Sequence, residues 1–171
     1  MLFRSVGPAA DPASVIGQAD MLQALQAIAR SESLFASRGD DSGTHKKELS
    51  LWAEAGVDPV VDSGAWYRET GSGMGATLNT AVAMGAYALS DRATWASFGN
   101  KGELRIVLEG DPRLFNPYGV ILVNPERFPH VRASLGQAFI DWLVSARGQA
   151  LIAGYVIDGA PVFFPDAMVA E

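Results

Sequence analysis

Two segments of the chain combine glycine, hydroxyl and charged residues in a pattern that could bind an anion. The first reads SRGDDSGTHKK from residue 37, and the second reads RETGSGMGATL from residue 68. In each, a short extended stretch runs into a glycine-rich turn that opens a helix. The first N–H groups of a helix have no intrahelical partner and lie at the positive end of its dipole. Glycine lets a ligand approach the backbone closely, so both turns predict oxyanion binding.

Arg38 follows the first extended stretch and could offer a planar, permanently charged fork to two ligand oxygens. The other candidate ligand-binding residues are backbone and hydroxyl donors of the two turns. They are Ser42, Gly43, Thr44, Thr70, Gly71, Ser72, Gly73, Met74 and Gly75.

Asp40 and Asp41 lie inside the first turn, where a carboxylate beside an anion is unfavourable unless it is neutralised or points away. Both are also good helix-capping residues. We therefore expect both to face the helix N-terminus or Lys46 and Lys47.

Ser42, His45 and the neighbouring aspartates also suggest a second kind of chemistry, nucleophilic catalysis. Nothing in the sequence orients His45 as a base toward Ser42, and no G-x-S-x-G elbow follows a strand. The glycines of GSGMG do not match the dinucleotide pattern G-x-G-x-x-G, and no Gly-Lys-Ser/Thr ends a P-loop. A hydrolase or transferase that uses the two turns as an oxyanion or phosphate site stays an alternative.

Composition narrows the class of protein further. The chain has 171 residues, 49% of them hydrophobic, and a formal net charge of −6. This acidic balance argues against nucleic acid as a partner. The sequence has no cysteine and two histidines far apart, which excludes thiolate catalysis and argues against a multi-histidine metal site. No apolar run is long enough to span a membrane, and the first residues lack the apolar core of a secretory signal.

The hydrophobic pattern alternates between strand-like and helix-like segments, which predicts an α/β fold with a central sheet. Predicted strands cover residues 1–6, 34–37, 104–110 and 118–125, and residues 64–69 are expected to be a strand end or an irregular segment. Predicted helices cover 19–30, about 42–56, 73–89 and 91–98, and a pair within 129–155 broken near 145–148. Residues 160–167 are expected to form a terminal tail, and the tryptophans are expected to pack in the core or at a hinge.

Four blocks of sequence together resemble the tungstate-binding proteins of ABC importers, in the type II periplasmic-binding-protein superfamily. The blocks are SRGDDSGTHKKE, WYRETGSGMGATLNTA, GDPRLFNPYGVILVNP and GQAFIDWLVSARGQALIAGY. The resemblance implies lobes of mixed sheet flanked by helices that close on an anion. It places Arg38 and Ser42–Thr44 on one wall of the cleft, with Thr70–Gly75 lining the same cleft. It further implies tungstate or molybdate held by hydrogen bonds, no cofactor and no metal ligands, an ABC permease as partner, and a periplasmic or extracellular location.

The chain resembles only the second half of such a protein. Residues 1–125 would form the second lobe with its two hinge strands, and 126–171 the helices that complete the first lobe. Without an export signal, an intracellular oxyanion-sensing or interaction module is the alternative. Asp111 and Arg113 are expected to pair across a turn in a structural role.

The helices at 131–154 carry a set of apolar side chains that the first lobe would normally cover. We therefore expect a homodimer, or association with the missing lobe, through this surface. The set comprises Val131, Leu135, Phe139, Ile140, Trp142, Leu143, Leu151 and Ile152.

Overall fold

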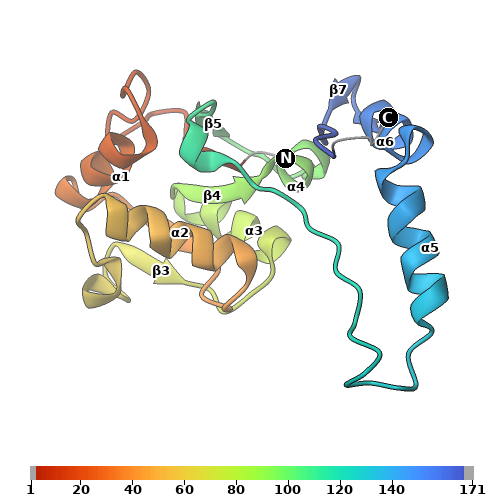
Figure 1. Cartoon of the computed structure of the whole chain (residues 1–171). Coiled ribbons are helices and arrows are strands. Elements are labelled where there is room, and N and C mark those ends of the chain that lie inside the picture. The colour runs from red at the N-terminus through yellow and green to blue at the C-terminus, as the bar shows by residue number, and fades with distance from the viewer. Residues whose placement is uncertain (1–2, 168–171) are drawn as a thin grey trace. The chain divides into compact units, whose positions relative to one another are not determined.

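The chain folds into two compact units that divide after Asn116 (Figure 1). The computed structural model describes residues 3–167, so the start of the strand predicted at 1–6 lies outside the described residues. Helices and strands mix throughout, which confirms the predicted α/β class. The division at 125 and the assignment of the parts to two lobes stay predictions.

A three-stranded antiparallel sheet forms one layer of the N-terminal unit. Its strands are β1 (Phe3–Pro8), β4 (Ala88–Asp91) and β5 (Leu104–Leu108), in the order β4-β1-β5. The central strand β1 is buried along almost its whole length. Ser5 faces Leu89 on one side and Leu108 on the other, and the register with β5 shifts between Ser5 and Val6.

A second, two-stranded sheet carries the two glycine-rich turns. Here β2 (Phe35–Ser37) pairs in parallel with β3 (Tyr67–Glu69), with Phe35 opposite Tyr67 and Ser37 opposite Glu69. The two strands therefore end at the same edge of the sheet. The predicted strands at 34–37 and 104–110 are confirmed within a few residues, and 64–69 ends in a strand.

Strands β2 and β3 are each followed by a helix, and further helices and turns complete the unit. The remaining elements are α1 (Met21–Arg30), α2 (Gly43–Glu54), η1 (Pro59–Asp62), α3 (Met74–Met84), α4 (Arg92–Ser97) and η2 (Pro112–Leu114). Helix α1 begins because Asp20 accepts the Gln23 N–H, and its periodic apolar residues Met21, Leu25 and Ile28 are buried. Asp91 caps α4 by accepting the Thr94 N–H.

The helix predicted at 73–89 is too long. Helix α3 ends at Met84 because Gly85 adopts the left-handed conformation (φ 61°), a common helix stop. Ala88–Asp91 then leaves as β4 and pairs with β1. The apolar run AVAMGAYAL reads equally well as helix or buried strand, so the sequence pattern could not separate the two.

Aromatic side chains form the centre of the core between the second sheet and α2. Trp52, Phe35 and Tyr67 are 0% exposed, and the Phe35 and Trp52 rings meet edge to face at 5.2 Å between centroids. Core packing is also confirmed for Trp66 and Trp95.

The C-terminal unit contains α5 (Ala133–Val144), α6 (Ala146–Gly154) and a small hairpin of β6 (Val156–Ile157) and β7 (Ala160–Pro161). The helix pair and its break are confirmed, since Ser145 ends α5 and caps α6 by accepting the Gly148 N–H. The hairpin uses part of the predicted tail. Trp142 is 44% exposed, so its predicted core role is wrong in this unit.

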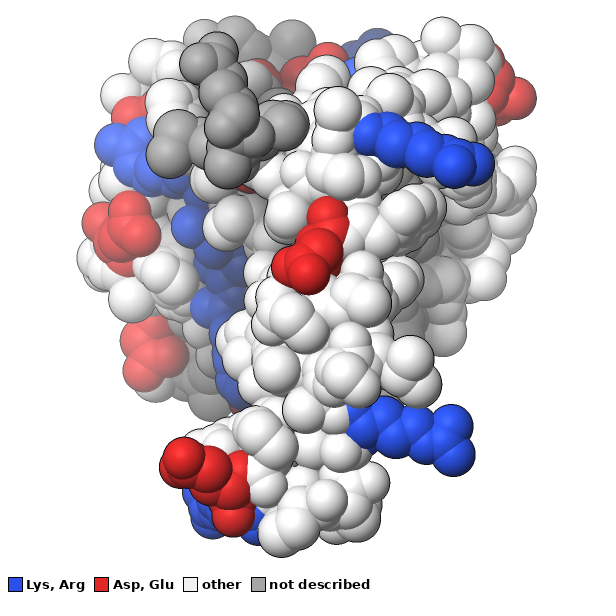
Figure 2. Space-filling view, turned by 45° about the vertical axis from the view of Figure 1, so that its right-hand side comes forward, with Lys and Arg blue, Asp and Glu red and all other residues white. Residues whose placement is uncertain are grey.

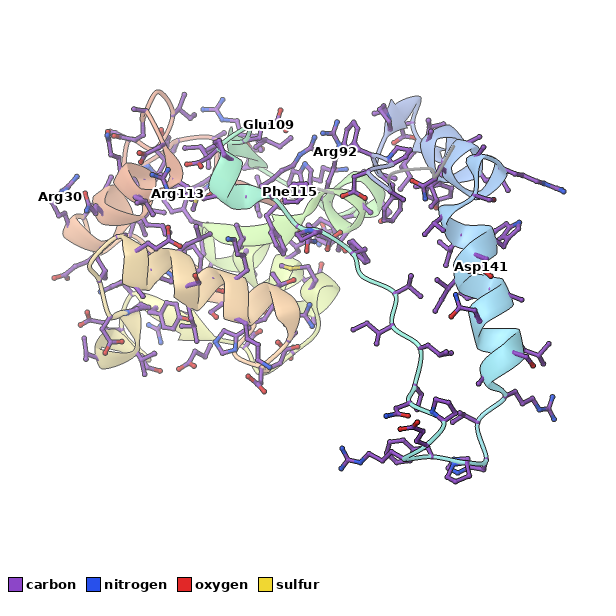
Figure 3. All side chains as sticks on the ribbon, viewed as in Figure 1. Arg30, Arg92, Glu109, Arg113, Phe115 and Asp141 are labelled. Carbon is purple, nitrogen blue, oxygen red and sulfur yellow. The ribbon has the colours of Figure 1, made fainter. Side chains whose placement is uncertain are left out.

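The strand predicted at 118–125 is wrong. Residues 117–124 follow Phe115 as an extended segment without strand pairing (Figures 1 and 3), and Ile121 is 89% exposed. A strand needs a neighbouring strand for its N–H and C=O groups, and no sheet within residues 3–167 includes this segment.

Candidate functional site

The two turns lie side by side because β2 and β3 are adjacent and parallel. The Thr70 N–H donates to the Ser37 carbonyl (2.9 Å), and the Ser72 N–H donates to the Arg38 carbonyl (3.1 Å). Gly39 has φ 58°, and a Cβ there would lie 2.9 Å from the Glu69 Cβ. Glycine at 39 therefore permits both the left-handed backbone and the close approach of the turns. Loops at the carboxyl ends of adjacent parallel strands commonly bind ligands.

The second turn leaves the N-terminus of α3 without a side-chain cap. Its N-cap is Gly73, which makes no side-chain hydrogen bond to the helix. The N–H groups that follow are therefore open to an acceptor from solution. The Met74 side chain is 6% exposed and packs in the core, so only its backbone N–H could serve a ligand.

Thr70 and Ser72 stabilise this turn with their hydroxyl groups. The Thr70 hydroxyl lies 3.1 Å from the Ser37 carbonyl and 2.8 Å from the Thr77 hydroxyl. The Ser72 hydroxyl donates to the Thr70 carbonyl at 3.0 Å. These side chains hold the two turns together, and the donors facing solution come from the backbone.

In the first turn, Ser42 is the N-cap of α2. Its oxygen accepts the His45 backbone N–H at 3.3 Å, as a capping serine should. Thr44 is 9% exposed, whereas Gly43 is exposed and has no atom within 4 Å of its Cβ position. The first turn of α2 is thus accessible on the side of Gly43.

The Arg38 guanidinium forms an ion pair with the Asp40 carboxylate. Its Nη2 and Nε lie 2.5 Å and 3.1 Å from the same Asp40 carboxylate oxygen, and the other oxygen accepts the Ser42 N–H at 3.2 Å. Hydrogen bonds from Ser42, together with Arg38, hold the pKa of Asp40 at about 2. The carboxylate therefore stays charged at any ordinary pH.

Asp40 faces the start of α2 as expected, because its carboxylate accepts the N–H of the N-cap Ser42. The same carboxylate also pairs with Arg38. Asp41 behaves as predicted, since its carboxylate lies 3.4 Å from the Lys46 ammonium and both side chains are exposed.

The geometry builds no catalytic relay from Ser42 and His45. The Ser42 oxygen binds a backbone N–H, and the His45 Nδ1 accepts the Asp41 backbone N–H at 3.1 Å. The imidazole therefore neither receives the Ser42 proton nor is oriented by a carboxylate in the way that a serine hydrolase requires.

Asp111 and Arg113 have the structural role that their spacing predicted. The buried Asp111 carboxylate accepts the Met21 N–H at 2.7 Å and pairs with Arg113 at 3.1 Å. Arg113 also lies 3.6 Å from Asp20 and 3.7 Å from Glu54. The pair thus joins the start of α1 to the end of α2.

Glu48 is a residue of this region that the sequence analysis did not single out. It is 2% exposed, and the Tyr67 hydroxyl donates to its carboxylate at 2.7 Å. Burial raises the pKa of Glu48 to about 7, although the bond from Tyr67 opposes the shift. The sequence does contain a signal for its burial. Glu48 is four residues from both Thr44 and Trp52, and this spacing places all three on the same, buried face of α2.

Between residues 3 and 167, His, Asp and Glu side chains nowhere gather in threes that could hold a metal ion. None of the helices described is both long and apolar enough to cross a membrane.

The fold is of the α/β class, and sequence comparison identifies the family of the chain. Residues 3–147 match the family described as PBP superfamily domain, so the chain belongs to the periplasmic-binding-protein superfamily. The expected resemblance at this level is confirmed.

The names of individual relatives are more specific than the description of the superfamily. The tungstate-binding protein TupA of Peptoclostridium acidaminophilum is 44% identical over 96% of this chain and 58% of its own length. A Haloferax volcanii protein, named as a candidate ABC transporter anion-binding protein, is 46% identical over 97% of this chain and 49% of its own. Among solved structures, TupA of Desulfovibrio alaskensis G20 superposes with a TM-score of 0.77 and 40% identity, over 98% of this chain and 68% of that one. The chain thus spans about half of the length of the curated relatives that it matches.

Proposed function

We propose that the chain forms the oxyanion-binding half of the substrate-binding component of an ABC importer, with tungstate as the preferred ligand and molybdate next. It binds and delivers the anion without chemistry and without a cofactor. One observation carries the proposal: two glycine-rich turns, each opening a helix, are hydrogen-bonded side by side at the ends of paired parallel strands. The names of its relatives support the choice of ligand.

The proposed site holds the anion through hydrogen bonds from both turns. Arg38 supplies charge, Ser42 a hydroxyl proton, and Gly43 and Thr44 backbone donors. The N–H groups at the start of α3 approach from the second turn. Because the oxo groups of tungstate accept these bonds, no protein atom binds the metal itself. An anion too small to reach all donors leaves some of them unpaired, which disfavours it.

Calorimetric titration of the chain with tungstate, molybdate, sulfate and phosphate tests the proposal. We expect tungstate to bind with a Kd below about 1 µM, and sulfate and phosphate at least about 100-fold more weakly. Binding of none of the four anions, by a chain shown to be folded by circular dichroism, would overturn the proposal.

Replacement of Asp40 by asparagine should tighten anion binding. The carboxylate occupies two donors of Arg38, so an incoming anion must displace it. Asp40→Asn removes this competing charge but keeps a side chain that can accept the Ser42 N–H. We expect the Kd for tungstate to fall about threefold to tenfold at low salt, measured by calorimetry. Asp41→Asn is the matched control, because Asp41 pairs with Lys46 at the surface; an equal gain there would argue for a general charge effect.

The proposed partner in transport is an ABC permease, and the proposed location is periplasmic or extracellular. Both follow from the class of protein to which the relatives belong. Interaction of the purified chain with a permease reconstituted from the same source would test the partner directly.

Self-association through α5 and α6 is a further prediction. Leu135, Phe139 and Leu151 are all more than half exposed, and α5 has no buried residue. Figure 2 shows that the side of this unit facing the viewer is largely uncharged, and an apolar hollow of about 670 Å³ lies beside Trp142 and Tyr155. Exposed apolar helix faces favour burial against a second copy. We expect light scattering to detect a dimer at micromolar concentration, and Leu135→Glu with Phe139→Glu to give a monomer; a monomeric parent chain would contradict this.

A further inference from the structure

Glu48 is a buried carboxyl group with no positive partner among the described residues 3–167. It is 2% exposed, and within residues 3–167 no lysine, arginine or histidine forms an ion pair with it. A buried carboxylate without a cation is costly, so such a group tends to hold its proton.

Short hydrogen-bonded links join Glu48 to both turns of the proposed site. It lies on α2, four residues after Thr44 in the first turn. Its partner Tyr67 (2.7 Å) lies on β3, three residues before Thr70. The buried Ser37 hydroxyl also interacts with the Glu48 carboxyl, and its oxygen accepts the Gly39 N–H at 3.3 Å. Glu48 therefore contacts the residues that lead into each turn.

The groups facing Glu48 come from three elements. From β3 these are the Tyr67 hydroxyl and the charge of Glu69, from β2 the Ser37 hydroxyl, and from α2 itself the Trp52 indole. Glu69 adds negative charge, and burial is the largest effect; together they raise the pKa of Glu48 to about 7. Burial likewise raises the pKa of Tyr67, so this hydroxyl remains a donor. The first turn itself carries the charged side chains of Arg38, Asp40 and Asp41, and His45 follows at the start of α2.

We infer that Glu48 is a positioning residue whose proton is linked to anion binding at the paired turns. This inference rests on the proposed function. An anion bound at the N-terminus of α2 would be repelled by a negative charge on Glu48, which lies on the same helix four residues after Thr44. Binding of the anion therefore favours the protonated carboxyl, and one Glu48 carboxylate takes up one proton as the anion arrives. By linkage, the anion binds more tightly at a pH where Glu48 is already neutral.

Calorimetry at several pH values, in buffers with different ionisation enthalpies, measures this linkage. We expect the Kd for tungstate to rise about fivefold or more between about pH 6 and about pH 8, with proton uptake near pH 7. In Glu48→Gln, which mimics the neutral acid, both effects should largely vanish. His45→Asn removes the imidazole near the start of α2, and this variant should keep the proton uptake.

A second variant does not depend on folding of Glu48→Gln. Tyr67→Phe removes the donor that favours the ionised carboxylate, so the midpoint of the pH dependence should move upward. Equal proton uptake in the wild-type and Glu48→Gln chains, or its loss in His45→Asn instead, would overturn the inference while leaving tungstate binding in place. A folded chain that binds no oxyanion at any pH would overturn the proposed function and the inference with it.

Discussion

Arg38→Ala should weaken tungstate binding by at least about 100-fold, the largest effect expected of any single substitution in the site. The Arg38 side chain is largely buried, with 19% exposed. A guanidinium in this setting gives two parallel donors and a charge that water screens poorly. Calorimetric titration with tungstate at low ionic strength measures the loss.

The Asp40 carboxylate also contributes to the expected effect of Arg38→Ala. Removal of Arg38 leaves the Asp40 carboxylate without its partner, and that charge would itself repel an anion. The double variant Arg38→Ala, Asp40→Asn separates the two effects, and it should still bind at least about tenfold more weakly than the wild-type chain. Arg30→Ala, at the exposed end of α1, is the matched control. Affinity within about threefold of wild type in Arg38→Ala would show that Arg38 does not bind the ligand.

Glu48→Gln should change how the stability of the ligand-free chain depends on pH. The pKa of Glu48 is about 7 in the folded chain, against a reference value of 4.5. Between these values the folded state holds a proton that the unfolded state has lost, so the free energy of unfolding falls as pH rises. This pKa difference lowers the free energy of unfolding by roughly 3 kcal/mol in total, and the full loss is reached above about pH 7. Glutamine avoids this cost, so the variant should match the wild type below about pH 4 and exceed it above about pH 7.

Urea denaturation at a series of pH values measures both curves. Glu103→Gln, which changes an exposed carboxyl of the same unit, is the control and should follow the wild-type curve. Parallel curves for the wild type and Glu48→Gln would show that Glu48 is ionised in the folded chain at neutral pH. This measurement requires no ligand, so it tests the state of Glu48 independently of the proposed function.

Local signals in the sequence were sufficient to predict the elements that carry the site. Ser42 caps α2 as its type and position indicate, and Gly73 opens α3 where the glycine-rich run predicts a helix start. Because each turn depends on neighbouring residues, its conformation could be inferred without knowledge of the rest of the fold. The adjacency of the two turns required the pairing of β2 with β3, which short strands do not reveal in sequence.

The features that the sequence did not reveal depend on contacts in three dimensions. The Arg38–Asp40 pair arises from the left-handed backbone at Gly39 and Asp41, where other side-chain directions were equally open. Glu48 lies in a charged run, KKELSLW, that resembles a solvated helix face until Tyr67 from β3 packs against it. The segment at 118–125 shows the opposite error, because strand-like residues form no strand without a neighbour to pair with.

The backbone bonds from Thr70 and Ser72 to the first turn have a consequence for how the chain would recognise its ligand. They restrict the movement of one group of donors relative to the other before any anion arrives, so the entropy of ordering two separate loops is lost on folding rather than on binding. A preorganised array of this kind responds to the distances between oxygens on the ligand. Tetrahedral ions of equal charge but different bond length then differ in fit.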